Sequence, residues 1–225
     1  MSEGHVTHDG VIHERLPQAE GASAAGAPVA GTPRLRWVRR WETQLDDGEL
    51  DRIREFLTRV FPNHPGGIQK AWAGSRPEVR LLGFDPADPA SGGDPDSTAG
   101  ELLAHIGITR RFLRSRQTGE SVLIGDVGLV GVSPDRQGQG LGKELMRQTD
   151  ASLAELGVAF GTLTTGENQI PFYSRAGWQI APEKLHAIDL DDHREVFDGP
   201  FFFRPVLAPA AAWLPGELER NGREI

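Results

Sequence analysis

The chain of 225 residues contains no cysteine. Disulfide bonds, thiolate nucleophiles and metal sites built on cysteine are therefore excluded, and nothing points to secretion. The sequence also lacks an apolar run approaching ~20 residues and an N-terminal segment of the signal-peptide kind. From these absences we expect a cytoplasmic protein without a membrane span.

Positive charge is also scarce, because 24 Lys and Arg stand against 32 Asp and Glu, for a formal net charge of −8. A nucleic-acid binder draws its affinity from Lys and Arg that neutralise phosphates, so we exclude nucleic acid as the partner. One basic run interrupts the acidic chain at Arg110, Arg111, Arg114 and Arg116. Such runs are mostly solvated surface, but this one also suits an acidic carrier protein or the phosphates of coenzyme A.

Composition divides the chain at about residue 33. Residues 1–33 are rich in Gly, Ala, Pro, Ser and His and show no periodicity, which predicts a disordered tail. Its histidines, His5, His8 and His13, are typical of a solvated tail, and we expect no metal. Residues 34–225 then form one folded domain.

Beyond the tail, apolar periodicity predicts a mixed order of strands and helices. Strands are expected near residues 34–42, 78–84, 101–114, 121–132, 158–165, 178–180 and 201–205, the last being the final strand of the sheet. Helices are expected over residues 47–60, 141–156 and 168–175, and a surface loop over 85–100. At the centre stands one strand–glycine loop–helix–strand unit, which favours an α/β fold.

The central glycine loop lies between Val132 and Lys143. The first amides of a helix lack intrahelical partners and the helix dipole favours negative charge, so a phosphate binds there readily. Gly138, Gly140 and Gly142 remove Cβ atoms from its path. The spacing G-x-G-x-G fits neither a dinucleotide fingerprint nor a P-loop, which requires Ser or Thr after the lysine. We therefore expect an anion site of another kind.

Two segments resemble signatures of the GNAT superfamily of acyl-CoA-dependent N-acyltransferases. The run from Gln137 to Gly142 resembles its pyrophosphate-binding motif, and the run from Asn168 to Trp178 resembles its Asn…Phe-Tyr-x-x-x-Gly-Phe segment. The resemblance implies an α/β fold of GNAT type, with a mixed central sheet flanked by helices. It implies an acyl-CoA or acyl-carrier-protein thioester as co-substrate. It places the donor phosphates at Gln137, Gly138, Gly140, Gly142 and Lys143.

A narrower resemblance covers most of the chain beyond residue 34. The segments Trp72 to Arg80, Ala104 to Phe112, Gly128 to Asp135, Glu155 to Gly161 and Arg220 to Ile225 look like NodA, the rhizobial nodulation N-acyltransferase family. That family moves a fatty acyl group from acyl carrier protein to the free amine of a chitin-oligosaccharide backbone. A weaker similarity, at Tyr173 to Trp178 and Trp213 to Gly216, links the chain to aminoglycoside 2′-N-acetyltransferases. The chain departs from NodA in its long tail, in Asp126 where that family has Glu, and in keeping Tyr173.

The chemistry expected is direct attack of an amine on a thioester, since no cysteine offers a covalent relay. The resemblance implies that a backbone amide, at Val130 or Val132, stabilises the oxyanion. Asp126 and His105 are alternative general bases. The alternative for Asp126 is a structural role, as a strand residue hydrogen-bonded to neighbouring amides. The alternative for His105 is that of a hydrogen-bonded core residue. Tyr173 is the expected proton donor to the leaving thiolate, or else a core aromatic beside Phe172.

We therefore expect an enzyme that N-acylates an amino sugar with a fatty acyl group. The alternatives are an acetyl-CoA-dependent aminoglycoside 2′-N-acetyltransferase and a non-catalytic sensor that binds acyl-CoA. The sequence leaves the oligomeric state open, a homodimer included. Of Trp37, Trp41 and Trp72, which suit stacking on sugars, at least two are expected in buried packing.

Overall fold

The computed structural model describes residues 34–64, 68, 70–86, 94, 96–189, 191–223 and 225; the predicted tail over residues 1–33 lies outside them. The helices are α1 (Asp47–Val60), α2 (Leu141–Glu155) and α3 (Ile170–Arg175). The strands are β1 (Arg36–Trp41), β2 (Val79–Phe84), β3 (Leu102–Ser115), β4 (Ser121–Val132), β5 (Phe160–Thr164), β6 (Gln179–Ile180), β7 (Leu185–Ile188), β8 (Arg194–Phe197), β9 (Phe201–Pro205) and β10 (Leu218–Arg223).

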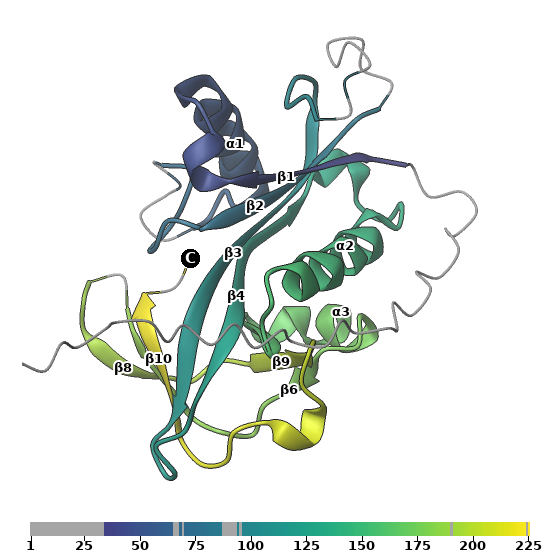
Figure 1. Cartoon of the computed structure of the whole chain (residues 1–225). Helices are drawn as coiled ribbons and strands as arrows, with labels where there is room; N and C mark the ends of the chain where they lie inside the picture. The colour runs from purple at the N-terminus through teal and green to yellow at the C-terminus, as the bar shows by residue number, and fades with distance from the viewer. Residues whose placement is uncertain are drawn as a thin grey trace, which may run out of the picture. The chain divides into compact units, whose positions relative to one another are not determined.

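All of these strands join one mixed sheet whose main path runs β6-β9-β5-β4-β3-β10-β7-β8, with β1 and β2 beside it. The long strand β3 makes this branching possible. Its first half pairs with β2, from Leu102 to Ile108, and its last residues pair with β10, from Leu113 to Ser115. Figure 1 shows the two branches leaving the same side of the long β3–β4 hairpin. The sheet therefore has a continuous side through β4 and a divided side beyond β3.

Helices cover the sheet on both faces. Successive side chains of a strand point to opposite faces, so each strand feeds two layers. On one face the buried residues of α1 pack with Leu82, Leu102 and Leu129. On the other, those of α2 pack with Leu81, Ile106 and Ile108. Figure 1 shows α1 on one side of the hairpin and α2 with α3 on the other. The strands β3 and β4 are thus held between two apolar layers.

The first turn of α1 is fixed by local hydrogen bonds. The Asp46 carboxylate accepts from the amide of Glu49 at 2.8 Å, and the Glu49 carboxylate accepts from the amide of Asp46 at 2.8 Å. This reciprocal capping box satisfies two amides at a helix start. The helix begins at Asp47, as the sequence predicts.

The predicted helices and strands are confirmed to within a few residues, but the prediction that residues 201–205 are the last strand is wrong. Strand β10 follows and lies between β3 and β7, antiparallel to the first and parallel to the second. Its sequence is LERNGR, in which Leu218 and Arg220 point inward. With so few apolar residues it carries no strand period, and the short polar strand β8 escapes detection for the same reason. None of the helices in the described residues combines the length and hydropathy that a bilayer crossing needs.

Candidate active site

The glycine loop forms the start of α2 as predicted. Gly138 and Gly140 have φ angles of 78° and 84°, in the left-handed region that favours glycine. Gly140 is the N-cap of α2, and no side chain caps the first amides of the helix. Residues 137–140 form turns and bends, and all four residues are exposed to solvent. An incoming anion therefore meets free helix amides without competition from a capping side chain.

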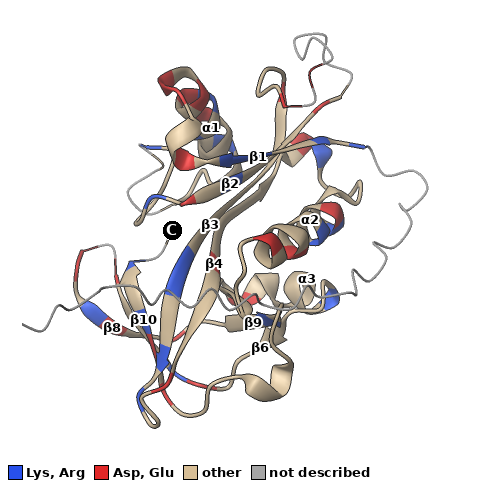
Figure 2. Cartoon of the chain, viewed as in Figure 1, with Lys and Arg blue, Asp and Glu red and all other residues tan. Residues whose placement is uncertain are grey.

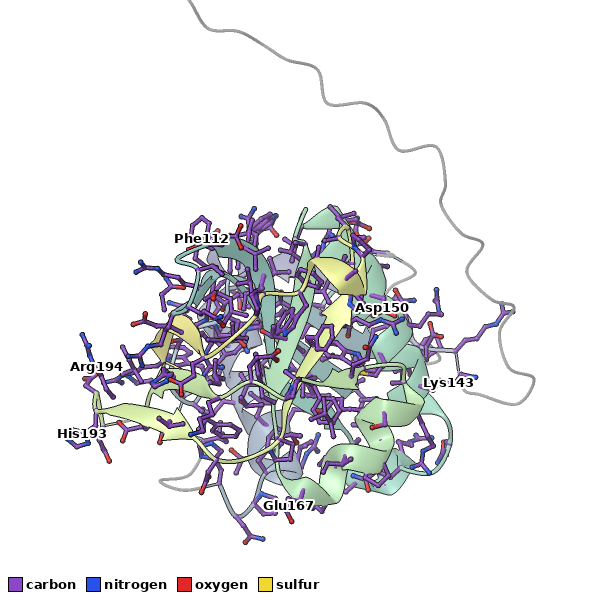
Figure 3. The ribbon with its side chains drawn as sticks, turned by 90° about the horizontal axis from the view of Figure 1, so that it is seen from below. Phe112, Lys143, Asp150, Glu167, His193 and Arg194 are labelled. Atoms are coloured by element: carbon purple, nitrogen blue, oxygen red, sulfur yellow. The ribbon has the colours of Figure 1, made fainter. Side chains whose placement is uncertain are left out.

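The third glycine of the loop has a different reason for being small. A Cβ on Gly142 would lie 2.9 Å from the ring of Phe172 in α3. Gly142 therefore lets α2 and α3 pack closely at the loop. Lys143 follows it on the exposed side of the helix, and Figure 3 shows its side chain projecting away from the body of the sheet. The ammonium group of Lys143 is thus free to meet a phosphate bound at the loop.

Strand β4 separates from β5 on its way to this loop. The parallel pairing of the two strands runs from Ile124 with Phe160 to Asp126 with Thr162 and stops there. In the described residues, no strand pairs with the β5 side of residues 127–132. An edge of six residues is about 20 Å long and presents N–H and C=O groups to an extended ligand. This edge ends at the glycine loop, so a thioester arm and its phosphate would be bound in one line.

A β-bulge interrupts β4 within the unpaired edge. His105 pairs with Gly131 and Gly107 with Gly128, so β4 has one residue more than β3 between these pairs. Leu129 has a φ of 53°, in the left-handed region. Strict alternation predicts Asp126, Gly128 and Val130 on one face. That prediction is wrong, because the extra residue turns Val130 toward the α2 layer, where it packs with Val127 and Val132.

His105 lies on β3 beneath this bulge and is fully buried. Its Nε2 atom lies 3.0 Å from Nη1 of Arg80, and its Nδ1 atom 2.9 Å from the carbonyl oxygen of Leu129. Burial, together with the positive charge of Arg80, lowers the pKa of His105 from 6.5 to about 3. The imidazole is therefore neutral near pH 7, and both of its nitrogens are occupied by hydrogen bonds.

Asp126 is buried in an ionic cluster that joins four strands. Its carboxylate contacts Nε of Arg111 at 3.0 Å and Nη1 of Arg220 at 3.3 Å. It also accepts a hydrogen bond from Thr162 Oγ1 at 3.4 Å. These partners come from β3, β10 and β5, and Asp126 itself from β4. The cluster gives Asp126 a structural role that its sequence position did not reveal.

Tyr173 lies on α3 in the apolar layer below the glycine loop. Its ring is 5.0 Å from Phe172 and 5.6 Å from Phe202, measured between centroids. Burial raises the pKa of the Tyr173 phenol to about 12. The hydroxyl therefore keeps its proton throughout the neutral range, as a donor to a thiolate requires.

The arginine run of β3 is divided between the two faces of the sheet. Arg111 is buried against Asp126, whereas Arg110 pairs with Glu78. Arg114 and Arg116 line a hollow of about 600 Å³ between β3, β7, β8 and β10, together with Arg194 and exposed Phe112. Figure 2 shows Lys and Arg positions in blue along β3, β8 and β10. Figure 3 shows Arg194, which lines this hollow, on the side opposite Lys143.

One group of possible metal ligands converges in the described residues. The donor atoms of Asp189, Asp191 and His193, in the turn between β7 and β8, lie within 4.8 Å of one another. The Asp189 carboxylate, however, accepts hydrogen bonds from the amides of Asp191 and His193 at 2.9 and 2.8 Å. These bonds cap an exposed turn, and the group therefore reads as turn structure.

Solved structures share this arrangement of strands and helices. A GNAT family N-acetyltransferase (YhbS) from Escherichia coli, solved in complex with CoA, aligns over 83% of this chain and 91% of its own, with a TM-score of 0.53 and 18% identity. An acyl-CoA N-acyltransferase from Pseudomonas aeruginosa aligns over 76% of this chain and 99% of its own, with a TM-score of 0.50 and 18% identity. The fold is thus that of the GNAT acyltransferases.

The sequence defines the family within that fold. The model of the nodulation protein A (NodA) family matches residues 32–225. A nodulation protein A from a Bradyrhizobium species is 35% identical over 211 residues, covering 86% of this chain and 93% of its own. One from Sinorhizobium fredii is 33% identical over 221 residues, covering 86% and 99%. The chain belongs to the nodulation protein A family and is an N-acyltransferase.

Sequence reasoning missed two residues that the structure brings to the site. Arg80 is fully buried in β2, and its guanidinium contacts the Glu42 carboxylate at 2.6 and 3.0 Å. A lone arginine inside the apolar run VRLLGF was the available signal, because a buried guanidinium requires an anionic partner. The sequence did not reveal which carboxylate that partner is, since Glu42 lies 38 residues away.

Proposed function

We propose that this N-acyltransferase moves a fatty acyl group from an acyl-carrier-protein or coenzyme A thioester to the free amine of an amino sugar. A de-N-acetylated chitin oligosaccharide is the acceptor we favour. The observation that carries the proposal is the unpaired edge of β4 leading into the glycine loop. The edge suits an extended arm with amide groups, and the loop suits the phosphate at the end of that arm.

The reaction that this geometry supports is direct aminolysis. The amine nitrogen attacks the thioester carbon and forms a tetrahedral intermediate, whose oxyanion accepts a hydrogen bond from a backbone amide. Of the two candidate donors we favour Val130, because it belongs to the bulge. The N–H of Val132 also points away from β3, since the Ser133 N–H donates to the Leu103 carbonyl beside the Ala104–Val132 pair. The intermediate then breaks its C–S bond. The amine loses one proton and the thiolate gains one, so the products are an amide and a free thiol.

The two proton transfers need different groups. We keep Tyr173 as the donor to the thiolate, because its phenol is protonated and it lies on α3 beside Phe172, which packs against the loop. We keep Asp126 as the candidate base to be tested, although two guanidinium groups hold its carboxylate. His105 has no unoccupied nitrogen and fits a base less well.

The donor phosphates belong at the glycine loop and Lys143, and not at the arginine run of β3. A carrier protein is attached to its arm through the phosphate, so it would dock beside Lys143. The hollow lined by Arg114 and Arg194 lies on the opposite side. We therefore do not expect the arginine run of β3 to receive the donor.

Trp41 is the tryptophan best placed to stack on a sugar ring. It is 42% exposed, whereas Trp37 and Trp72 are partly buried against the two apolar layers. The guanidinium of Arg110 lies over its ring, 5.5 Å from the centroid. Sugar rings present C–H groups that pack on such faces. We propose that Trp41 contributes to acceptor binding.

A matrix of donors and acceptors tests the proposal. Acetyl-CoA, a long-chain acyl-CoA and a long-chain acyl carrier protein are each combined with a partly de-N-acetylated chitin tetramer, a fully N-acetylated tetramer and an aminoglycoside. Released thiol is measured directly, because the enzyme has no cysteine to contribute background, and mass spectrometry identifies the product. We expect thiol release only when a long-chain donor is combined with the partly de-N-acetylated chitin tetramer. Turnover with acetyl-CoA and the aminoglycoside alone would favour the acetyltransferase alternative, and donor binding without turnover would favour the sensor.

A further inference from the structure

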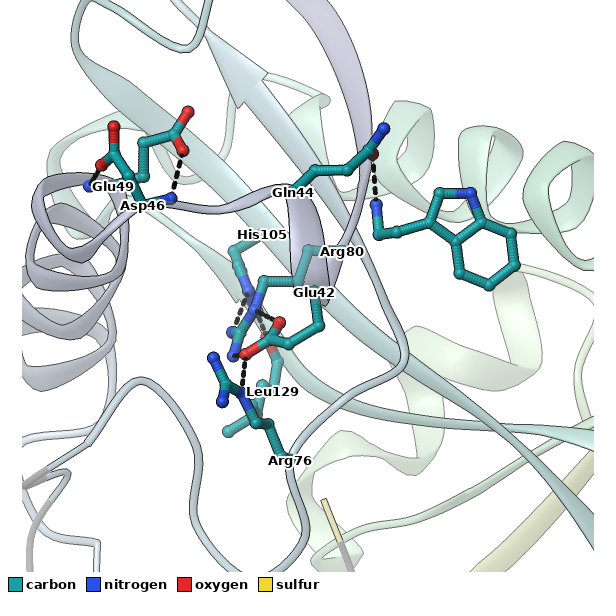
Figure 4. Close-up of polar contacts among 9 residues, drawn as sticks. Glu42, Gln44, Asp46, Glu49, Arg76, Arg80, His105 and Leu129 are labelled. Carbon is teal, nitrogen blue, oxygen red and sulfur yellow. Dashed lines mark hydrogen bonds and ion pairs between the residues drawn. The ribbon is translucent and has the colours of Figure 1, made fainter.

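A continuous chain of polar side chains runs from the exposed Arg76 into the protein interior below the bulge of β4. Arg76 Nε donates to the Glu42 carboxylate at 2.7 Å, and Arg80 donates to the same carboxylate through two nitrogens. Arg80 Nη1 is hydrogen-bonded to His105 Nε2, and His105 Nδ1 is hydrogen-bonded to the carbonyl oxygen of Leu129. Figure 4 shows these contacts in sequence, with the carboxylate between the two guanidinium groups. Arg80 and His105 are fully buried. Burying such polar groups costs free energy unless they are hydrogen-bonded, and both are hydrogen-bonded here.

The direction of each hydrogen bond in this chain is fixed by chemistry. A guanidinium has only N–H donors, so Nε2 of His105 must accept from Arg80. The neutral imidazole then carries its proton on Nδ1, and that N–H donates to the Leu129 carbonyl at 2.9 Å. The ring cannot turn over without breaking both bonds. The Leu129 carbonyl is therefore held toward the His105 ring.

Fixing this carbonyl also fixes an amide. The carbonyl of Leu129 and the N–H of Val130 belong to one planar trans peptide group, in which they point in opposite directions. A carbonyl held toward His105 thus turns the Val130 N–H away from it. Leu129 itself is in the left-handed region, which costs a residue with a Cβ about 1–2 kcal/mol. Such a conformation persists only when its surroundings hold it.

We propose that Glu42, Arg80 and His105 are positioning residues that lock the Leu129–Val130 peptide and so aim the Val130 amide at the thioester oxygen. The inference rests on the proposed function, in which that amide stabilises the oxyanion. It gives His105 a task other than proton abstraction. It also accounts for a buried arginine in β2 that contacts neither the glycine loop nor the donor edge.

The test removes the donor to Leu129 and then restores it. His105→Leu deletes both hydrogen bonds of the imidazole, and His105→Asn keeps an N–H donor near the position of Nδ1. Leu214→Ala, in a separate apolar cluster, serves as a control for lost stability. For each folded variant we would measure kcat, the KM for donor, coenzyme A affinity by calorimetry, and the pH–rate profile. The Val130 amide resonance, in protein labelled with ¹⁵N-valine, reports on the peptide without requiring activity.

We expect His105→Leu to lower kcat by up to about 100-fold, the effect of losing one oxyanion donor. Coenzyme A affinity should stay within about 3-fold of wild type, because the loop is untouched. The loss should be equal across pH, His105→Asn should recover part of it, and the Val130 resonance should move in the first variant more than in the second. Leu214→Ala should keep its kcat below its melting temperature. If His105→Leu does not fold, Glu42→Gln takes its place, with a smaller loss expected.

Two results would overturn the proposal: an unchanged kcat in folded His105→Leu, or activity that recovers at high pH, which would make His105 a base. A wild-type protein that binds coenzyme A but acylates no acceptor would instead refute the proposed function. In that case the Val130 resonance still decides the positioning role, because a peptide locked by His105 must change its amide environment when the imidazole is removed.

Discussion

At the scale of single residues, burial decides what each candidate group can do. Tyr173 and His105 are both buried, yet burial raises the pKa of the first to about 12 and lowers that of the second to about 3. Both shifts favour the neutral form, because a charge is costly in an apolar layer. Neutral forms suit a phenol that donates a proton and an imidazole that orients a carbonyl. A pKa of about 3 also makes the His105 imidazole too weak a base to take up a proton readily near pH 7.

The role of Tyr173 can be tested by removing one oxygen atom. Tyr173→Phe keeps the ring that packs on Phe172 and Phe202, so the fold and the coenzyme A affinity should stay close to wild type. Turnover should fall by about 100- to 10,000-fold if the phenol protonates the thiolate, the typical range for general acid catalysis. Steady-state kinetics with calorimetry measures both quantities. Equal turnover in the variant would reduce Tyr173 to a packing residue.

Asp126→Asn should destabilise the protein strongly, in contrast to the small defect expected for a modestly buried aspartate. The change leaves Arg111 and Arg220 without their carboxylate, and breaking a buried ion pair costs about 3–5 kcal/mol. Urea unfolding measures the loss. Asp150→Asn is the matched control, because its pair with Arg204 is partly exposed and should contribute only about 1 kcal/mol. Similar losses in the two variants would show that the Asp126 cluster is not a strong structural tie.

The same variant tests the base. In folded Asp126→Asn, activity that is lost near neutral pH and recovers at high pH identifies a base, because the amine there deprotonates unaided. Activity that is reduced equally at every pH leaves only the structural role.

At the scale of elements, the junction between β4 and α2 unites strand edge, bulge and helix start. Gly140→Val should abolish donor binding, because the branched side chain would stand at the phosphate position and resist a φ of 84°. Gly157→Val is a matched control at the other end of the same helix, with a φ of 72° and no neighbouring atom within 4 Å. It carries the same backbone strain and should bind coenzyme A normally. Equal affinity in both variants would place the donor elsewhere.

At the scale of the whole molecule, the buried histidine makes stability depend on pH. The folded-state pKa of His105, about 3, lies below its ordinary value of 6.5. As pH falls through this range, the unfolded chain takes up a proton that the folded protein does not. Stability should therefore fall by up to about 1.4 kcal/mol per pH unit. Above about pH 6.5 the imidazole is neutral in both the folded and the unfolded state, so this loss of stability is absent.

Urea unfolding of wild type and His105→Asn at pH 7, 6, 5 and 4 checks this window. The stability difference between the two proteins should narrow as pH falls, because the variant lacks the titrating group. Leu214→Ala, which removes no titratable group, should show a constant difference from wild type. A constant difference for His105→Asn as well would contradict the burial argument.

Local patterns in the sequence determined the parts of this protein that depend on neighbours in the chain. The capping residues Asp46 and Glu49 fix the start of α1, and the apolar run of residues 121–132 has the same bounds as β4. The glycine loop was visible because helix amides and missing Cβ atoms are local properties. The family followed from the same local motifs.

Only the tertiary structure decided the features that depend on distant contacts. The bulge at Leu129 arises from the register between β3 and β4, and alternation within one strand cannot reveal it. The partners of Arg80 and of Asp126 lie 38 and 94 residues away in the sequence, at Glu42 and Arg220. A charged residue in an apolar run indicates that a partner of opposite charge is needed. Which residue is that partner depends on which strands become neighbours in the fold.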